Sequence, residues 1–157
     1  MTAIGVTGHQ YIPPDALDYV IAGIRACLHA QPTPLIGYSS LAVGADQLFA
    51  RELLSAGGEM VAIIPSQRYE TTFAGGALQW YEELLALCTE TVVLDFPEPT
   101  EDAFMAAGDE VIRRCDVLIA VWDGLPATGL GGTGDAVAHA RRLRRNVVVI
   151  WPEGVRR

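Results

Sequence analysis

The sequence predicts one α/β domain over residues 1–157, built on a doubly wound, mostly parallel β-sheet of about six strands. Three observations support this fold class. Short apolar runs alternate along the chain with segments of helical periodicity. Most of these runs are unbroken, which is typical of strands covered on both faces of a sheet. The length of 157 residues suits one domain, and the sequence contains no linker, internal repeat or low-complexity tract.

The first strand is expected at residues 3–6, where a short apolar run precedes a polar loop. Pro13 and Pro14 then suit the start of a helix, because the first helical position needs no backbone N–H donor. Apolar residues follow at i, i+3, i+4 and i+7, which indicates an amphipathic helix that ends before Pro32. Residues 35–38 form the next apolar run and the second expected strand.

A second helix is expected over residues 45–56, with two glycines after its end. Residues 60–64 are apolar and precede a proline, which predicts the third strand. A looser stretch leads to a helix over 77–88, and the fourth strand follows at 91–94. Trp80 lies at a helical position that favours the hydrophobic core.

The last third of the chain repeats the alternation. A helix is expected over 101–114, with Phe104 assigned to its core-facing side. Residues 117–121 predict a buried strand, a glycine-rich loop leads to a helix over 133–144, and the final strand is expected at 147–151. The whole pattern therefore predicts alternate strands and helices.

Charge and cysteine content exclude several function classes. The formal net charge is −8, which makes nucleic acid an improbable partner. All eleven basic residues are arginine, so Schiff-base chemistry on lysine and a P-loop lysine are excluded. Cys27, Cys88 and Cys115 are far apart and read as core thiols. We expect neither a metal site nor a resident cofactor.

The basic residues are concentrated near the end of the chain, where six of the eleven occur after position 140. We interpret them as favourable charges at a helix C-terminus and as a solvated tail. No apolar run reaches the ~18 residues of a membrane span, and residues 1–5 lack a basic leader. We therefore expect a cytoplasmic protein without membrane contact.

Ligand sites in doubly wound sheets lie at the carboxyl ends of the strands, where the sheet order reverses. The loops that follow the expected strands are rich in glycine, serine, threonine, histidine and aspartate. The candidate ligand or phosphate contacts are Thr7, Gly8, His9, Ser39, Ser40, Gly44, Asp46, Gly124, Gly131, Gly132 and Thr133. The candidate catalytic carboxylates are Asp123 and Asp135.

The segment Gly131–Thr133 is the strongest of these signals. It stands where a strand gives way to a helix, and helix N-termini bind phosphate through free N–H groups. The alternative is that the glycines only form a tight turn. Thr7–Gly8 and Ser39–Ser40 at neighbouring strand ends favour phosphate binding.

Three blocks resemble one protein family. They are Gly5–His9, Ser39–Asp46, and the stretch from Cys115 through Gly124 to Asp135. They look like the SLOG superfamily, which includes the LOG-like ("lysine decarboxylase-like") and DprA-related proteins, and the resemblance extends from Ile4 to Trp151. It implies a Rossmann-like fold that binds nucleotides or nucleotide-derived ligands.

The resemblance also raises an enzymatic alternative. LOG enzymes release a free base and ribose 5-phosphate from nucleoside 5′-monophosphates, usually as homodimers, and carry a glutamate three positions after the threonine of their glycine loop. Here that position is Ala136, and the acid is Asp135. We therefore favour a nucleotide-binding protein, with an N-glycosidase as the alternative and a homodimer as the expected assembly.

Several residues retain two interpretations. His9 either contacts the ligand or makes a structural hydrogen bond in its loop. Trp122 either stacks on a base or belongs to the core. Asp46 and Asp123 either contact ribose or serve a helix cap and a turn, respectively. We expect His139 to have no catalytic role.

Overall fold

The computed structural model describes residues 1–126 and 132–157. Within these residues six strands form one sheet, and every neighbouring pair is parallel. The strands are β1 (Thr2–Gly8), β2 (Leu35–Ser39), β3 (Glu59–Ile64), β4 (Glu90–Val93), β5 (Val117–Val121) and β6 (Asn146–Ile150). The helices are α1 (Pro14–His29), α2 (Ala45–Ser55), α3 (Gly75–Leu87), α4 (Glu101–Arg114) and α5 (Thr133–Arg142). A 3₁₀ turn, η1 (Tyr69–Thr72), follows β3.

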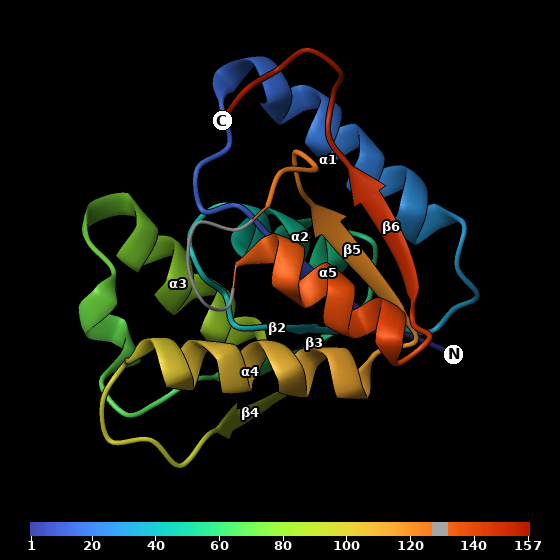
Figure 1. Ribbon diagram of the computed structural model, residues 1–157. Coiled ribbons are helices and arrows are strands. Elements are labelled where there is room, and N and C mark those ends of the chain that lie inside the picture. Colours follow the sequence, from blue (N-terminus) through green and yellow to red (C-terminus); the bar gives the residue numbers. More distant parts are fainter. Residues whose placement is uncertain (127–131) are drawn as a thin grey trace.

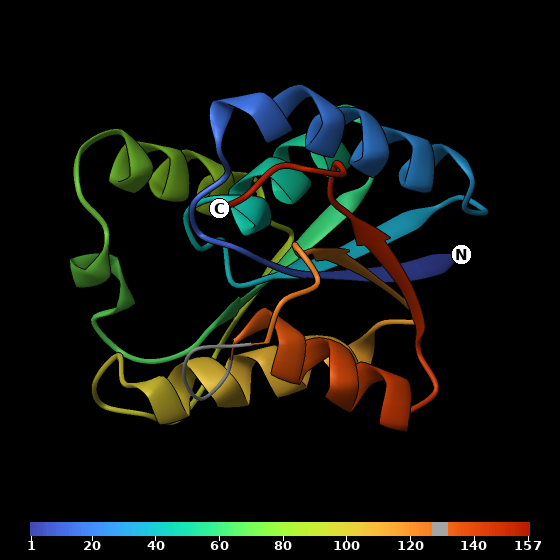
Figure 2. The ribbon, with the colours of Figure 1, turned by 45° about the horizontal axis from the view of Figure 1, so that its top comes forward.

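The helices cover both faces of the sheet, as Figures 1 and 2 show. α1, α2 and α3 lie on one face, and α4 and α5 lie on the other. Each face has its own hydrophobic cluster, with Ile4 and Ile119 in the first and Ile63 and Leu118 in the second. All four side chains are fully buried. The predicted doubly wound α/β fold is therefore confirmed.

The strand order β4-β3-β2-β1-β5-β6 places the switch point of the sheet next to β1. The chain moves outward from β1 to β4, crosses back through α4, and adds β5 and β6 on the other side. β1 therefore pairs with β2 and with β5, and Gly8 lies in register with Val121. Ligand sites of such sheets lie beyond the carboxyl ends of the strands that flank this point.

Two residues assigned to the core are exposed, so these predictions were wrong. Phe104 is 40% exposed because the buried stripe of α4 consists of Ala103, Ala107 and Val111, and the next position is rotated by about 100°. Trp80 is 38% exposed and packs against the guanidinium of Arg51, 4.6 Å from its ring centroid.

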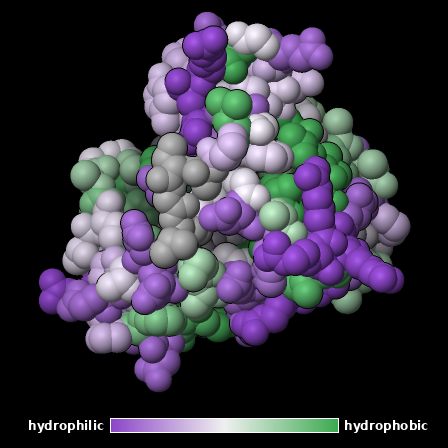
Figure 3. Space-filling view, viewed as in Figure 1, coloured by the Kyte–Doolittle hydropathy of each residue, from purple (hydrophilic) through white to green (hydrophobic). Residues whose placement is uncertain are grey.

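The cysteine prediction holds for two thiols, because Cys27 and Cys115 are buried, whereas Cys88 is half-buried. The helix α5 ends two residues before the predicted limit. Arg144 adopts a left-handed conformation (φ 59°), and the N–H of Arg145 closes the turn on the carbonyl of Ala140. Hydrophilic side chains gather on the surface over this end of α5 (Figure 3). No helix among the described residues is long and apolar enough to cross a membrane.

Candidate functional site

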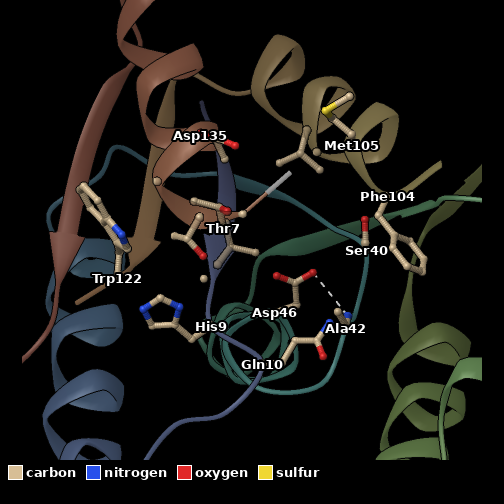
Figure 4. Close-up of a pocket in the computed structure, with 18 of the residues that line it drawn as sticks. Thr7, His9, Gln10, Ser40, Ala42, Asp46, Phe104, Met105, Trp122 and Asp135 are labelled. Carbon is tan, nitrogen blue, oxygen red and sulfur yellow. Dashed lines mark hydrogen bonds between the residues drawn. The ribbon is translucent and has the colours of Figure 1, made fainter. Parts of the chain in front are cut away.

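A cavity of about 1130 Å³ opens at the carboxyl ends of β1, β2 and β5. The first turns of α2 and α5 and one side of α4 complete its wall, so both faces of the sheet contribute to it (Figure 4). Small-molecule sites usually have volumes of about 300–1,000 Å³, so this cavity is large enough for a nucleotide.

Most of the candidate residues meet in this cavity. Those that line it are Thr7, Gly8, His9, Ser40, Asp46, Gly132, Thr133 and Asp135. Ser39, Gly44, Asp123 and Gly124 are not among the lining residues, and Gly131 lies outside the described residues. Ser39 is fully buried, and its hydroxyl accepts a hydrogen bond from the N–H of Leu41.

Two glycines allow the strand ends to meet closely. A Cβ atom on Gly8 would lie 2.4 Å from the Cβ of Ala45 and 2.8 Å from that of Val121. Gly44 has a φ of +88°, and a Cβ there would lie 2.3 Å from the carbonyl oxygen of Gln10. The absence of a side chain at both positions lets the first turn of α2 pack directly against the end of β1.

Asp46 lies on the floor of the cavity, in the first turn of α2 (Figure 4). Its Oδ2 accepts a hydrogen bond from the N–H of Ala42 at 3.3 Å. Desolvation raises the pKa of this carboxyl to about 6, although hydrogen bonds from Ala42, Ser39 and Ser40 oppose the shift. A carboxyl with this pKa can exchange a proton near neutral pH.

His9 and Asp123 join the ends of β1 and β5. The N–H of Asp123 donates to Nε2 of His9 at 3.1 Å, so the imidazole proton belongs on Nδ1. Burial and the charge of Arg157 lower the pKa of His9, outweighing the neighbouring Asp123 carboxylate, 3.3 Å from Nε2, which would raise it. A neutral His9 therefore makes a structural hydrogen bond in its loop.

Asp123 closes a turn. Burial alone would raise the pKa of its carboxyl, but the N–H of Leu125, the guanidinium of Arg157 and His9 together lower it. The distances are 3.0 Å from Leu125 N to Oδ1 and 2.9 Å from Arg157 Nε to Oδ2. The carboxylate is thus ionised and engaged by other groups of the protein.

The N-terminus of α5 faces the cavity with no side-chain cap. The first helical hydrogen bond runs from Ala136 N to Gly132 O, so the N–H groups of Thr133, Gly134 and Asp135 precede the helical ladder. Such N–H groups, together with the helix dipole, attract anions.

Sequence reasoning missed three parts of this wall. Phe104 and Met105 of α4 present apolar side chains to the cavity. Tyr69 of η1 also lines it, with 6.2 Å between its ring centroid and that of Phe104. Arg157 also lines the cavity and pairs with Asp123, a contact that the prediction of a solvated tail did not include, although its side chain is 38% exposed. One sequence signal points to Phe104 as a wall residue. It directly follows Ala103, which belongs to the buried periodicity of α4, so its own side chain is turned away from the core.

The wall also holds the residue pair His139 and Asp109, whose Nε2 and Oδ1 atoms are 3.7 Å apart between α5 and α4. Trp122 lines the cavity and donates from its indole N–H to the carbonyl of Leu125. Among the described residues, no group of histidine, cysteine and carboxylate side chains could hold a metal ion.

Neither a family model nor a curated protein matches this sequence. Solved structures do match its fold. DNA processing protein A of Streptococcus pneumoniae gives a TM-score of 0.64 at 19% identity, over 94% of this chain and 50% of that protein. The protein TM1055 gives 0.59 at 16% identity, over 94% and 72%. The molybdenum cofactor carrier protein of Chlamydomonas reinhardtii gives 0.56 at 17% identity, over 94% and 75%.

The chain has a Rossmann-like fold that is similar to the folds of these three proteins. The resemblance drawn from the three sequence blocks is thereby confirmed for the fold. The chain spans only half the length of the pneumococcal protein, and identities below 20% carry the architecture alone. Within this Rossmann-like fold, the cavity occupies the switch point between β1 and β5.

Proposed function

We propose that the protein binds a nucleotide or nucleotide-derived ligand in this cavity, with its phosphate at the N-terminus of α5 near Gly132 and Thr133. The observation that carries the proposal is the position of the cavity. It lies at the switch point of the sheet and is bordered by the uncapped first turn of α5 and by Thr7 and Gly8. Free N–H groups and a hydroxyl donor together suit a phosphate.

The rest of the cavity suits the other parts of a nucleotide. Phe104 and Met105 supply an apolar surface against which a base can pack. Asp46 and Asp135 supply carboxylates that can accept hydrogen bonds from ribose hydroxyls. In this arrangement the phosphate, at the N-terminus of α5, is kept apart from the carboxyl of Asp46 on the floor of the cavity.

A small ligand is favoured over a nucleic-acid strand. The Chlamydomonas protein is named a cofactor carrier, whereas DNA processing protein A from Helicobacter pylori is described as binding single-stranded DNA. The present chain has a net charge of −8, and Asp46, Asp109 and Asp135 line the cavity. A polyanionic strand would meet repulsion there.

Native mass spectrometry of the purified protein tests this proposal. The panel consists of the four ribonucleoside 5′-monophosphates, NAD and ADP-ribose, each at a concentration near 100 µM, roughly the upper part of the range of metabolite affinities. An adduct of intact ligand mass is the expected result. If no member of the panel binds, the proposal is wrong.

A second candidate is an N-glycosidase that cleaves a nucleoside 5′-monophosphate to free base and ribose 5-phosphate. The observation in its favour is Asp46, whose pKa of about 6 suits a general acid or base inside the cavity. Asp135 is the second carboxylate for such chemistry, and Asp123 is less suited because Arg157 and Leu125 engage it. The masses of free base and ribose 5-phosphate in the same experiment would identify this activity.

We also propose that the protein forms a homodimer. The outer edge of β6 and the neighbouring surface of α1 expose apolar side chains, with Tyr19 54% and Val149 44% exposed. An unprotected edge strand of this kind favours pairing with another copy. Sedimentation equilibrium distinguishes a dimer from a monomer.

A further inference from the structure

Residues 151–157 return from the end of β6 to the cavity. The ring of Trp151 stands edge-on to His9, with 5.3 Å between the ring centroids. The indole N–H of Trp151 donates to the carbonyl of Val155 at 2.8 Å, which folds this segment back on itself. Arg157 consequently reaches the cavity, beside the loop that joins β1 to α1 (Figures 1 and 2).

The side chain of Arg157 is held in place by the carboxylate of Asp123. Its Nε donates to Oδ2 of Asp123 at 2.9 Å, and the Asp123 side chain is only 4% exposed. The other oxygen of this carboxylate accepts a hydrogen bond from Leu125 N. A charge-assisted bond to a nearly buried carboxylate restricts a long side chain that would otherwise sample many rotamers.

The remaining atoms of the guanidinium are available to a ligand. Only Nε contacts Asp123, and the described part of the chain supplies no hydrogen-bond acceptor to Nη1 or Nη2. Their N–H groups form a planar fork that matches two oxygens of a phosphate or carboxylate. Arg157 is 38% exposed at its side chain, which leaves this fork accessible from the cavity.

The charges around the cavity indicate what the Nη groups of Arg157 can bind. The carboxylates of Asp46, Asp109, Asp135 and Glu101 line the described wall, against the guanidinium groups of Arg142 and Arg157. Arg142 lies within 3.5 Å of His139, on the outer part of the α5 wall. An anionic ligand therefore needs a fixed cation on the side of β5, and Arg157 is placed there.

We propose that Arg157 is an anion-binding residue of this cavity that contacts the phosphate of the ligand, and that Asp123 is the positioning residue that aims it. The inference rests on the proposed nucleotide-binding function and deepens it, because it names the residue that recognises the phosphate of the ligand. It also gives Asp123 a role in place of the catalytic one considered from the sequence.

The test compares ligands with and without a phosphate. Titration calorimetry measures the affinity of the four ribonucleoside 5′-monophosphates and of the four corresponding nucleosides for the wild type, Arg157→Gln and Arg156→Gln. Arg156 is the matched control, since it is the exposed neighbouring arginine. Arg157→Gln should weaken monophosphate binding about 10- to 100-fold. Nucleoside affinity should stay unchanged, and Arg156→Gln should leave both affinities unchanged.

Asp123→Asn tests the positioning role. It should weaken monophosphate binding in the wild-type background and add nothing in the Arg157→Gln background, because the two residues then act through one contact. Additive losses would contradict this role. Thermal unfolding of each variant shows whether the fold is retained, and comparison with the nucleosides separates a loss of folded protein from a loss of phosphate recognition.

The outcomes separate the two proposals. If the wild type binds none of the eight probes and neither NAD nor ADP-ribose, the nucleotide-binding function and the inference fail together. If the wild type binds a monophosphate and Arg157→Gln binds it equally well, the function stands and the inference fails. An equal loss for monophosphate and nucleoside also overturns the inference, because the contact would then not involve the phosphate.

Discussion

The backbone N–H of Asp123 donates a hydrogen bond to Nε2 of His9, 3.1 Å away and 114 positions earlier in the chain. This bond closes the junction between β1 and β5, at which the sheet reverses its order. Trp151 covers the imidazole from the side of β6. The wall of the cavity on this side is thus built from hydrogen bonds between backbone and side chains, and not from loosely packed loops.

The close approach at Gly44 predicts a large loss of stability on substitution. In Gly44→Ala the new methyl group would meet the carbonyl oxygens of His9 and Gln10, which belong to the backbone. Gly57 has a similar φ of +84° but no atom within 4 Å, so Gly57→Ala isolates the conformational cost of about 1–2 kcal/mol. Gly44→Ala should cost about 1–3 kcal/mol more in urea unfolding. Equal losses of stability in Gly44→Ala and Gly57→Ala would mean that the backbone at His9 and Gln10 moves away from the new methyl group without cost.

The phosphate position at α5 predicts a specific effect of Gly132→Val. Gly132 has a φ of −70°, so a side chain causes no backbone strain there, but it would cover the N–H groups that face the cavity. Nucleotide binding should be lost while the unfolding temperature changes little. Gly76→Val in α3 is the control, because no atom lies within 4 Å of the added Cβ. Unchanged affinity in Gly132→Val would refute the phosphate position.

Two polar residues of α5 are expected to differ in their importance. Asp135→Asn should weaken nucleotide binding, or turnover if the protein is an enzyme, more than His139→Ala does. The reason is position, since Asp135 lies in the first turn of α5, whereas His139 lies one turn later beside Asp109. Affinity measurements on both variants decide the order, and the reverse order would show that the ribose contact is elsewhere.

The carboxyl of Asp46 makes the stability of the fold depend on pH. Its pKa is raised from 3.8 to about 6, so the folded state binds this proton more tightly than the unfolded state does. The stabilisation is complete below the unfolded pKa and is lost as the pH rises toward 6. Asp46→Asn should therefore gain about 2–3 kcal/mol over the wild type between pH 4 and pH 7.

Denaturant unfolding at a series of pH values measures this difference. Asp18→Asn, on the exposed surface of α1, removes the same formal charge and serves as the control. A constant difference between Asp46→Asn and the wild type across this range would contradict the raised pKa.

The alternation of strands and helices was predictable because each element carries its own signal. β5 and α4 have the expected limits, since an unbroken apolar run and a proline-flanked amphipathic segment define them. The short turn η1 was missed, because four residues do not establish a period. Phe104 was misassigned because a stripe of alanines, which a hydrophobicity pattern underweights, forms the buried face of α4.

The site was predictable in outline because parallel strands bring their carboxyl ends to one edge of the sheet. Contacts between loops were not, because they depend on tertiary geometry. Nothing in the sequence places Arg157 beside Asp123, 34 positions earlier. The pattern of glycines likewise gave no way to distinguish Gly8 and Gly44, which allow close packing, from Gly132, which borders the cavity.

The central place of β1 has a consequence for how the cavity forms. β1 precedes every other strand in the sequence, yet one of its two partners is β5, so one edge of β1 pairs only with a strand from the last third of the chain. Pairings of such long sequence separation slow folding. The cavity is lined by residues from Val6 to Arg157, so it is complete only when both partners of β1 are in place. A nucleotide that binds it would report on finished molecules and would shift the folding equilibrium toward them in proportion to its own concentration.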